Sequence, residues 1–93
     1  MSDFFKKITV LLILKFLFTS SISLAEIIKK IEIQGNERIS SETIKMFSKT
    51  SIGDDVSEND LNNILKDVYE SSFFNDVKVS INNNILSIRV IEN

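Results

Sequence analysis

The 93-residue sequence predicts an α+β domain with the element order β-α-α-β-β, in which two helices cover one face of a three-stranded mixed sheet. Two observations inside the domain support this fold class: apolar residues alternate near both of its ends, and an apolar stripe with helical spacing lies between them. A third observation sets the amino terminus apart, because residues 1–25 hold 15 of the 40 hydrophobic residues. The sequence therefore divides into a leader at 1–25 and a domain at 26–93.

The leader has the three-part pattern of a secretory signal peptide. Two lysines near its start precede an apolar run over residues 8–18, and small residues lead to a cleavage site between Ala25 and Glu26. We expect residues 1–25 to form a signal-peptide helix that is removed, so that the domain at 26–93 is exported.

The alternative is that the leader stays attached as a membrane anchor. A spanning helix needs about 20 apolar residues, whereas the apolar run has 11 residues and contains Lys15. A lysine near the middle of a span costs about 2.5–3.5 kcal/mol. Cleavage is therefore the favoured prediction, and the absence of cysteine excludes a lipid-modified amino terminus.

The first half of the domain predicts a strand followed by a short helix. Apolar and charged residues alternate over 27–34, which indicates a strand, and Gly35 and Asn36 end it because both tolerate positive φ. Ser40 can then cap a helix by accepting a hydrogen bond from one of its first free amides. We expect this helix to reach about Ser48.

A second, longer helix follows a turn over residues 49–56. Ser57 and Asp60 have the spacing of a capping box at its start. Five apolar residues then follow the helical spacing i, i+3, i+4, i+7, i+8, namely Leu61, Ile64, Leu65, Val68 and Tyr69. We expect this stripe to pack into the core.

The last part of the domain predicts a β-hairpin. Residues 77–81 and 86–91 both alternate apolar with polar positions, and the Asn triplet at 82–84 joins them. Phe73 and Phe74 come just before the hairpin, and consecutive strand residues face opposite ways. We expect one of these rings in the core and the other exposed as a possible anchor for a partner.

The residue inventory argues against catalysis. The chain has no Cys and no His, which removes zinc, thiol and the usual haem or copper sites, and with them the Cys–His and Ser–His–Asp nucleophiles. The net charge of −2 gives no reason to expect a nucleic-acid partner. Asp54 and Asp55 lack the spaced ligands of a calcium loop. We therefore expect no enzyme activity, no metal or other cofactor, and no small-molecule substrate.

The element order and several short stretches resemble the POTRA domain, the polypeptide-transport-associated module. The matching stretches are residues 31–39, 53–57, 60–61, 74–79 and 86–93. Together they span essentially all of the 68 residues that follow the leader. One departure is Ser72, which stands where the family usually has a glycine and whose Cβ disfavours a left-handed backbone there.

The resemblance implies a role for the domain. An export leader followed directly by such a domain resembles the start of outer-membrane protein assembly factors, so we expect an amino-terminal fragment at the periplasmic face of the outer membrane. The implied partners are unfolded outer-membrane protein precursors, neighbouring POTRA domains and assembly-complex lipoproteins. Two alternatives stay open: a POTRA domain of a cell-division protein anchored in the inner membrane, and a POTRA domain of a two-partner secretion transporter.

The resemblance also implies where partners bind. In POTRA folds the last strand is central, which leaves the strand Phe74–Asn82 at an edge with unpaired N–H and C=O groups. An unfolded chain can add to such an edge as an extra strand through main-chain hydrogen bonds. The expected partner-binding residues are Phe74, Val77, Lys78, Val79, Ser80, Ile81 and Asn82.

Overall fold

A computed structural model describes residues 25–93, so the leader prediction lies outside the described residues except at Ala25. The described chain forms two helices and five strands, two of the strands being only two residues long. In chain order the elements are β1 (Glu26–Ile27), β2 (Lys30–Gln34), α2 (Ser41–Ser48), β3 (Asp55–Val56), α3 (Glu58–Tyr69), β4 (Phe74–Asn82) and β5 (Ile85–Glu92).

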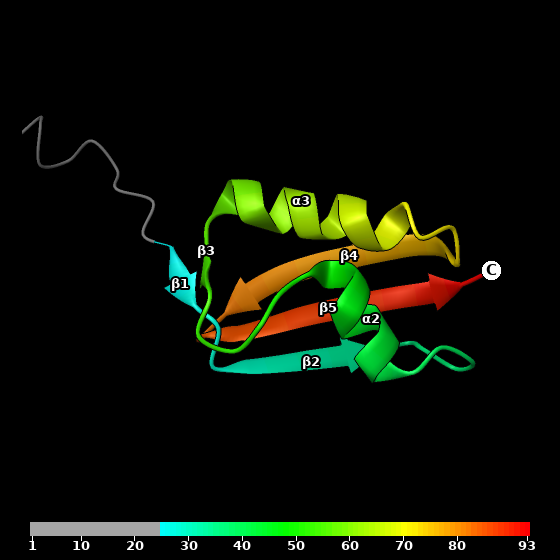
Figure 1. Ribbon diagram of the computed structural model, residues 1–93, viewed down its shortest axis with the longest axis horizontal. Coiled ribbons are helices and arrows are strands. Elements are labelled where there is room, and N and C mark those ends of the chain that lie inside the picture. The colour runs from blue at the N-terminus through cyan, green and yellow to red at the C-terminus, as the bar shows by residue number, and fades with distance from the viewer. Residues whose placement is uncertain (1–24) are drawn as a thin grey trace, which may run out of the picture.

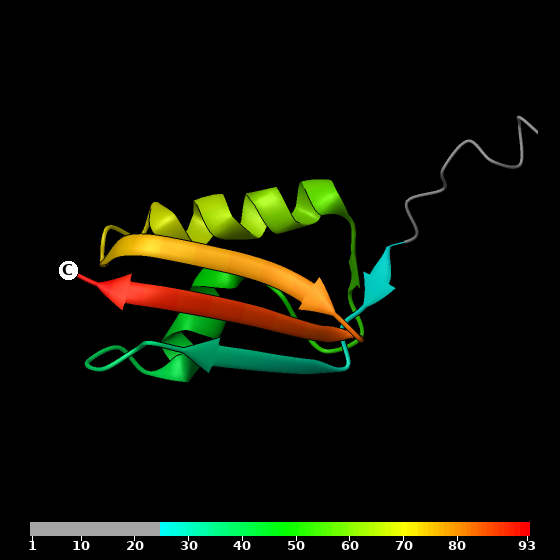
Figure 2. The same cartoon turned by 180° about the vertical axis from the view of Figure 1, so that it is seen from behind.

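The main sheet has three strands in the order β2-β5-β4. The last strand, β5, is central: it runs parallel to β2 and antiparallel to β4. Figure 1 shows both helices on one face of this sheet, with α3 along β4 and α2 on the side of β2, and Figure 2 shows the opposite face uncovered. The predicted α+β class and the two-layer arrangement are confirmed.

The core lies between the sheet and the two helices. It draws on every main-sheet strand and both helices, because alternate strand residues and one stripe of each helix point into the same layer. Its most buried apolar side chains are Ile28, Ile44, Val56, Ile64, Val68, Phe74, Val77, Leu86, Ile88 and Val90, with Ile31 and Ile33 of β2 packed against them. The open face of the sheet is consequently left mainly to polar and charged side chains, with Ile91 of β5 as an exposed apolar exception.

The single strand predicted over 27–34 is two strands with different partners. β1 pairs antiparallel with β3 in a separate two-stranded sheet, and β2 pairs with β5. The chain changes partner at Ile28, which is fully buried, while Ile27 is 47% exposed. The prediction was wrong on this point because an alternation pattern reports which residues face inward and carries no information about which strand lies alongside.

Both helices begin as the capping signals predict. The Ser40 hydroxyl accepts a hydrogen bond from the Thr43 amide at 3.2 Å. Ser57 and Asp60 form a complete capping box, in which each side chain accepts a bond from the amide of the other residue. The Ser57 amide and hydroxyl both donate to the Asp60 carboxylate, at 2.9 and 2.8 Å, and these two hydrogen bonds lower the pKa of Asp60.

The predicted apolar stripe of α3 is wider than the surface that the helix buries. Ile64 and Val68 are buried and Leu61 is half-buried, but Leu65 is 37% exposed and Tyr69 is 52% exposed. The expectation that the whole stripe belongs to the core is therefore wrong at its outer flank. A short three-stranded sheet is too narrow to cover that flank, because α3 lies along the edge strand β4 (Figure 1).

Non-glycine residues take the left-handed conformation at several turns. Ser72 does so with φ 71°, although a side chain is disfavoured there, and Lys49 does so with φ 55° at the end of α2. Asn83 and Asn84 both have positive φ in the two-residue turn between β4 and β5. This is the backbone of a type I′ hairpin turn, which fixes the register of the two strands.

Candidate functional site

The structure places all seven predicted partner-binding residues on β4, at one free edge of the sheet. Phe74 and Val77 are buried, and Val79 and Ile81 are half-buried on the face covered by the helices. The remaining three lie exposed on the open face: Lys78, Ser80 and Asn82. The predicted position of β4 at an edge is confirmed; that partners bind there is not tested by the fold.

The hairpin geometry tells which backbone groups of β4 point away from the sheet. In an antiparallel pair the residues alternate between bonding to the partner and facing outward, and the pair that closes a two-residue turn is bonded. Asn82 and Ile85 are that closing pair. It follows that Val77, Val79 and Ile81 direct their N–H and C=O groups toward the free edge.

An exposed flank of α3 runs beside this edge. Asp60, Asn63 and Asp67 lie on the side of the helix that faces the end of α2. Since each residue turns a helix by about 100°, Leu65 and Tyr69 lie on the opposite side, above the free edge of β4. The sequence reasoning missed this feature, because the helical stripe that contains both side chains was assigned wholly to the core.

The carboxyl end of β5 is hydrogen-bonded to two loops, one after β2 and one just before β4. The Glu92 carboxylate accepts hydrogen bonds from the backbone amides of Glu37 and Arg38, and these bonds lower its pKa. Asn93 donates from its backbone to the Phe73 carbonyl at 3.0 Å and from its side chain to the Ser72 carbonyl at 2.8 Å. The start of β4 is thereby held in place.

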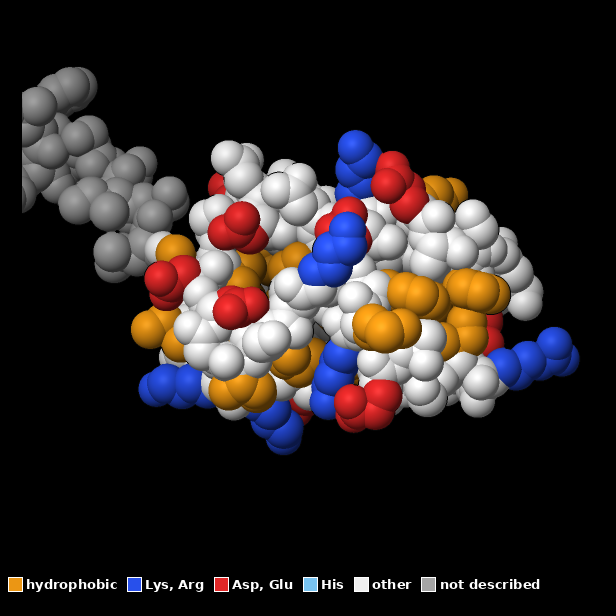
Figure 3. Space-filling view, viewed as in Figure 1, with side chains coloured by type: hydrophobic (Ala, Val, Ile, Leu, Met, Phe, Trp, Pro, Cys, Tyr) orange, Lys and Arg blue, Asp and Glu red, His pale blue; other side chains and the backbone are white. Residues whose placement is uncertain are grey.

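One of the two consecutive phenylalanines is buried and the other is exposed, as predicted, but Phe73 precedes β4 and its ring lies on the same helix-covered side as Phe74. Phe74 is 4% exposed, whereas Phe73 is 51% exposed and stacks on Phe47 of α2 with the ring centroids 5.8 Å apart. Apolar side chains gather on this face of the molecule between α2 and the carboxyl-terminal end of α3 (Figure 3). The Phe73 ring remains a candidate anchor for a partner.

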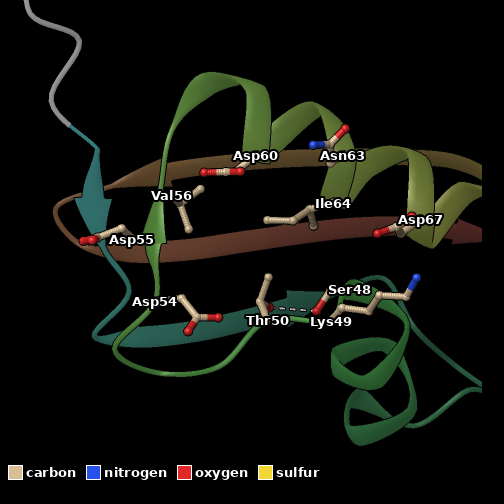
Figure 4. Close-up of a pocket in the computed structure, with 10 residues that line it drawn as sticks. All are labelled: Ser48, Lys49, Thr50, Asp54, Asp55, Val56, Asp60, Asn63, Ile64 and Asp67. Atoms are coloured by element: carbon tan, nitrogen blue, oxygen red, sulfur yellow. Dashed lines mark hydrogen bonds between the residues drawn. The ribbon is translucent and has the colours of Figure 1, made fainter.

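A pocket of about 310 Å³ between α3 and the loop after α2 is lined by four aspartates (Figure 4). Its carboxylates are spread along the pocket, from Asp55 on β3 to Asp67 on α3. Asp60 is used in the capping box, and Asp54 accepts a hydrogen bond from the Ser51 amide at 2.9 Å. Within residues 25–93 no group of three or more acidic side chains is arranged to hold a metal ion.

The described residues also contain no helix long and apolar enough to cross a membrane.

Comparison with known sequences assigns the fold to a family. Residues 26–93 match the POTRA family, which is described as surface antigen variable number repeat. The chain belongs to the POTRA family. The match covers all of the described elements from β1 to β5, so the earlier resemblance holds for the whole fold.

Individual relatives agree with this membership. The chain is 32% identical over 77 residues to the outer membrane protein assembly factor BamA of Neorickettsia risticii (strain Illinois), a match that covers 83% of this chain. The chain spans only about 10% of that curated relative's length.

Solved structures of Omp85 proteins share the fold at low sequence identity. The N-terminal domain of Omp85 from Thermosynechococcus elongatus superposes with a TM-score of 0.65 at 14% identity, over 71% of this chain and 30% of that chain. The POTRA1-2 region of Omp85 from Anabaena superposes with a TM-score of 0.59 at 16% identity, over 74% of this chain and 47% of that chain.

Proposed function

We propose that this POTRA domain is a non-catalytic periplasmic module of the machinery that assembles β-barrel proteins into the outer membrane. In this role it binds unfolded polypeptides by adding them as a strand to the free edge of β4. Family membership, the similarity to a BamA sequence and the predicted export leader support this periplasmic location. Neighbouring POTRA domains and assembly lipoproteins are its further proposed partners, and the leader is proposed to be cleaved between Ala25 and Glu26.

The observation that carries the binding proposal is the outer edge of the nine-residue strand β4, to which no other strand of residues 25–93 is paired. Its outward N–H and C=O groups bond to any extended chain, whatever the side chains of that chain are. Lys78, Ser80 and Asn82 on the open face oppose uncontrolled pairing of one domain edge with another. An edge of this kind suits a module that receives many different client sequences.

The flank of α3 adds a preference for clients of one chemistry. A strand added beside β4 presents alternate side chains to the helix-covered face, where it meets Leu65, Tyr69 and the half-buried Val79. Its other side chains face the polar, open side. The favoured client is thus an extended segment with alternating apolar and polar residues, which is the pattern of strands in outer-membrane barrels.

A proline substitution tests the edge directly. Val79 has its N–H directed outward, so Val79→Pro removes a donor from the free edge without removing a hydrogen bond to β5. Val79→Ala is the matched control, because it loses the same side-chain packing and keeps the amide. We expect an alternating apolar–polar peptide of about 11 residues to bind Val79→Pro about fivefold to tenfold more weakly than Val79→Ala.

Fluorescence anisotropy with a labelled peptide measures the two dissociation constants, and circular dichroism establishes that both variants are folded. Equal affinities of the two folded variants would show that strand addition at β4 is not the mechanism.

A further inference from the structure

The strand β1 begins immediately after the peptide bond at which the leader is expected to be removed. Ala25 is exposed, but Glu26 is already the first residue of β1 and is paired with Val56 of β3. Two residues later, Ile28 is fully buried in the core. No linker therefore separates the Ala25–Glu26 bond from the folded domain.

Parts of the chain that are distant in sequence hold β1 in place. The Asn84 side-chain amide donates to the Ile27 carbonyl at 2.9 Å, from the turn between β4 and β5. The Ile28 amide donates to the Asp54 carbonyl at 2.9 Å, and the Ile28 carbonyl accepts from Gly53 at 2.7 Å. These contacts exist only after the carboxyl-terminal hairpin and the loop before β3 have folded.

Proteases cut folded proteins mainly from locally opened states, since the bond must be accessible and free of its own strand partners. When opening is fast compared with cleavage, the rate follows the population of the open state. A bond that enters a paired strand at its first residue is protected by that pairing.

From this geometry we infer that docking of β1 blocks removal of the leader, so that a membrane-bound signal peptidase cuts this chain before β1 pairs with β3. In the reaction, water adds across the Ala25–Glu26 bond. Ala25 leaves as the carboxylate end of the leader, and Glu26 gains a free α-amino group. A precursor that completes its fold first keeps its leader until β1 opens. This inference uses the proposed leader cleavage but not the proposed strand binding at β4.

The experiment compares two substrates that share the same bond. The first is the purified chain of residues 1–93, folded in detergent, and the second is a synthetic peptide of residues 1–40, which lacks β3 and the hairpin. A purified bacterial signal peptidase is added to each, and mass spectrometry follows cleavage between Ala25 and Glu26. We expect the folded chain to be cut at least about tenfold more slowly than the peptide.

A pair of turn variants then tests whether β1 docking causes the protection. Asn84→Gly keeps a residue that accepts positive φ and removes the amide that holds Ile27. We expect it to be cut about fivefold faster than the wild-type chain, as the loss of one hydrogen bond implies. Asn83→Gly is the control, because it alters the same turn while the contact to Ile27 stays intact, and we expect the wild-type rate.

The remaining outcomes each overturn a different part of the inference. Equal rates for the folded chain and the peptide would show that docking does not protect the bond. Equal acceleration by Asn83→Gly and Asn84→Gly would show that a general loosening of the hairpin, rather than the contact to β1, controls access. If the peptide of residues 1–40 is not cut between Ala25 and Glu26, the proposed cleavage site is wrong. That outcome would leave the proposed strand binding at β4 unaffected, since the Val79 variants test it separately.

Discussion

The two free edges of the sheet differ in length and in their neighbouring side chains. β4 has nine residues and lies beside the exposed apolar flank of α3, whereas β2 has five residues and lies beside the shorter helix α2. The surface next to β2 is also apolar in part, since Met46 is 68% exposed and Ile52 is 62% exposed. Its hollow of about 630 Å³ has a basic rim that includes Lys30 and Lys45.

This comparison separates two sources of affinity. Main-chain pairing grows with the number of outward backbone groups, which favours the longer strand β4. Apolar contact grows with the buried area, which is available at both edges. If strand addition governs binding, the β4 edge is the stronger site, whereas a purely apolar mode of binding would make the two edges similar.

The largest effect, a loss of stability, is expected from Gly35→Ala, which changes the residue directly after β2. Gly35 has φ 88°, and a Cβ at this position would lie 2.0 Å from the Val90 carbonyl oxygen of β5. The backbones must separate there, so we expect a loss of about 3 kcal/mol or more in the free energy of unfolding. Urea denaturation measures this loss, and hydrogen exchange should show β2 amides less protected than those of β4.

Gly53→Ala is the matched control for that substitution. Gly53 also has a positive φ, of 98°, but a Cβ there meets no atom within 4 Å. The added Cβ only disfavours the left-handed backbone, so we expect the free energy of unfolding to fall by about 1–2 kcal/mol. Equal losses in the two variants would mean that the close approach of Gly35 to Val90 is not what requires glycine.

The next effect concerns peptide binding and compares the apolar flanks of the two edges. We expect Leu65→Gln/Tyr69→Gln to weaken binding of the alternating peptide about tenfold, because two partly exposed apolar side chains lose their contact with it. The matched variant at the other edge, Met46→Gln/Ile52→Gln, should stay within about twofold of the wild type. Fluorescence anisotropy gives both dissociation constants. A larger loss of affinity in Met46→Gln/Ile52→Gln would show that the peptide binds beside β2 instead.

The sequence predicted the local elements of this domain better than their relations. The capping residues Ser40 and Ser57 marked both helix starts, because a cap depends only on neighbours along the chain. The split between β1 and β2 at Ile28 could not be predicted, since it depends on where β3 lies in space. The family resemblance predicted that β4 is an edge strand. The exposure of Leu65 beside that edge could not be predicted, because it depends on where α3 packs on the sheet.

A smaller effect with a defined pH dependence is expected at Glu92. Its lowered pKa means that the carboxylate is favoured in the folded state, so its stabilising contribution is present at neutral pH. This contribution is lost as the pH falls below the ordinary carboxyl range and through the lowered pKa. We expect Glu92→Gln to be less stable than the wild type at pH 7 and the difference to shrink toward pH 3.

Urea denaturation at a series of pH values measures this convergence, with the exposed neighbour Glu37→Gln as the control. A difference between Glu92→Gln and the wild type that stays constant over the whole pH range would contradict a role for the charged carboxylate.

The smallest effect is expected from glycine at the two left-handed residues that follow the helices. Ser72 precedes the β4 edge and Lys49 follows α2 on the β2 side, with φ 71° and 55°. Removing the Cβ relieves about 1–2 kcal/mol of backbone strain, and the greater freedom of glycine in the unfolded chain offsets about half of this. We therefore expect Ser72→Gly and Lys49→Gly each to gain about 0.5–1 kcal/mol in unfolding free energy.

Ser71→Gly, whose φ is not positive, should instead lose stability. Since neither gain touches the outward groups of β4, peptide affinity should not change; a change with Ser72→Gly alone would show that the rigidity at the start of β4 is part of the binding site.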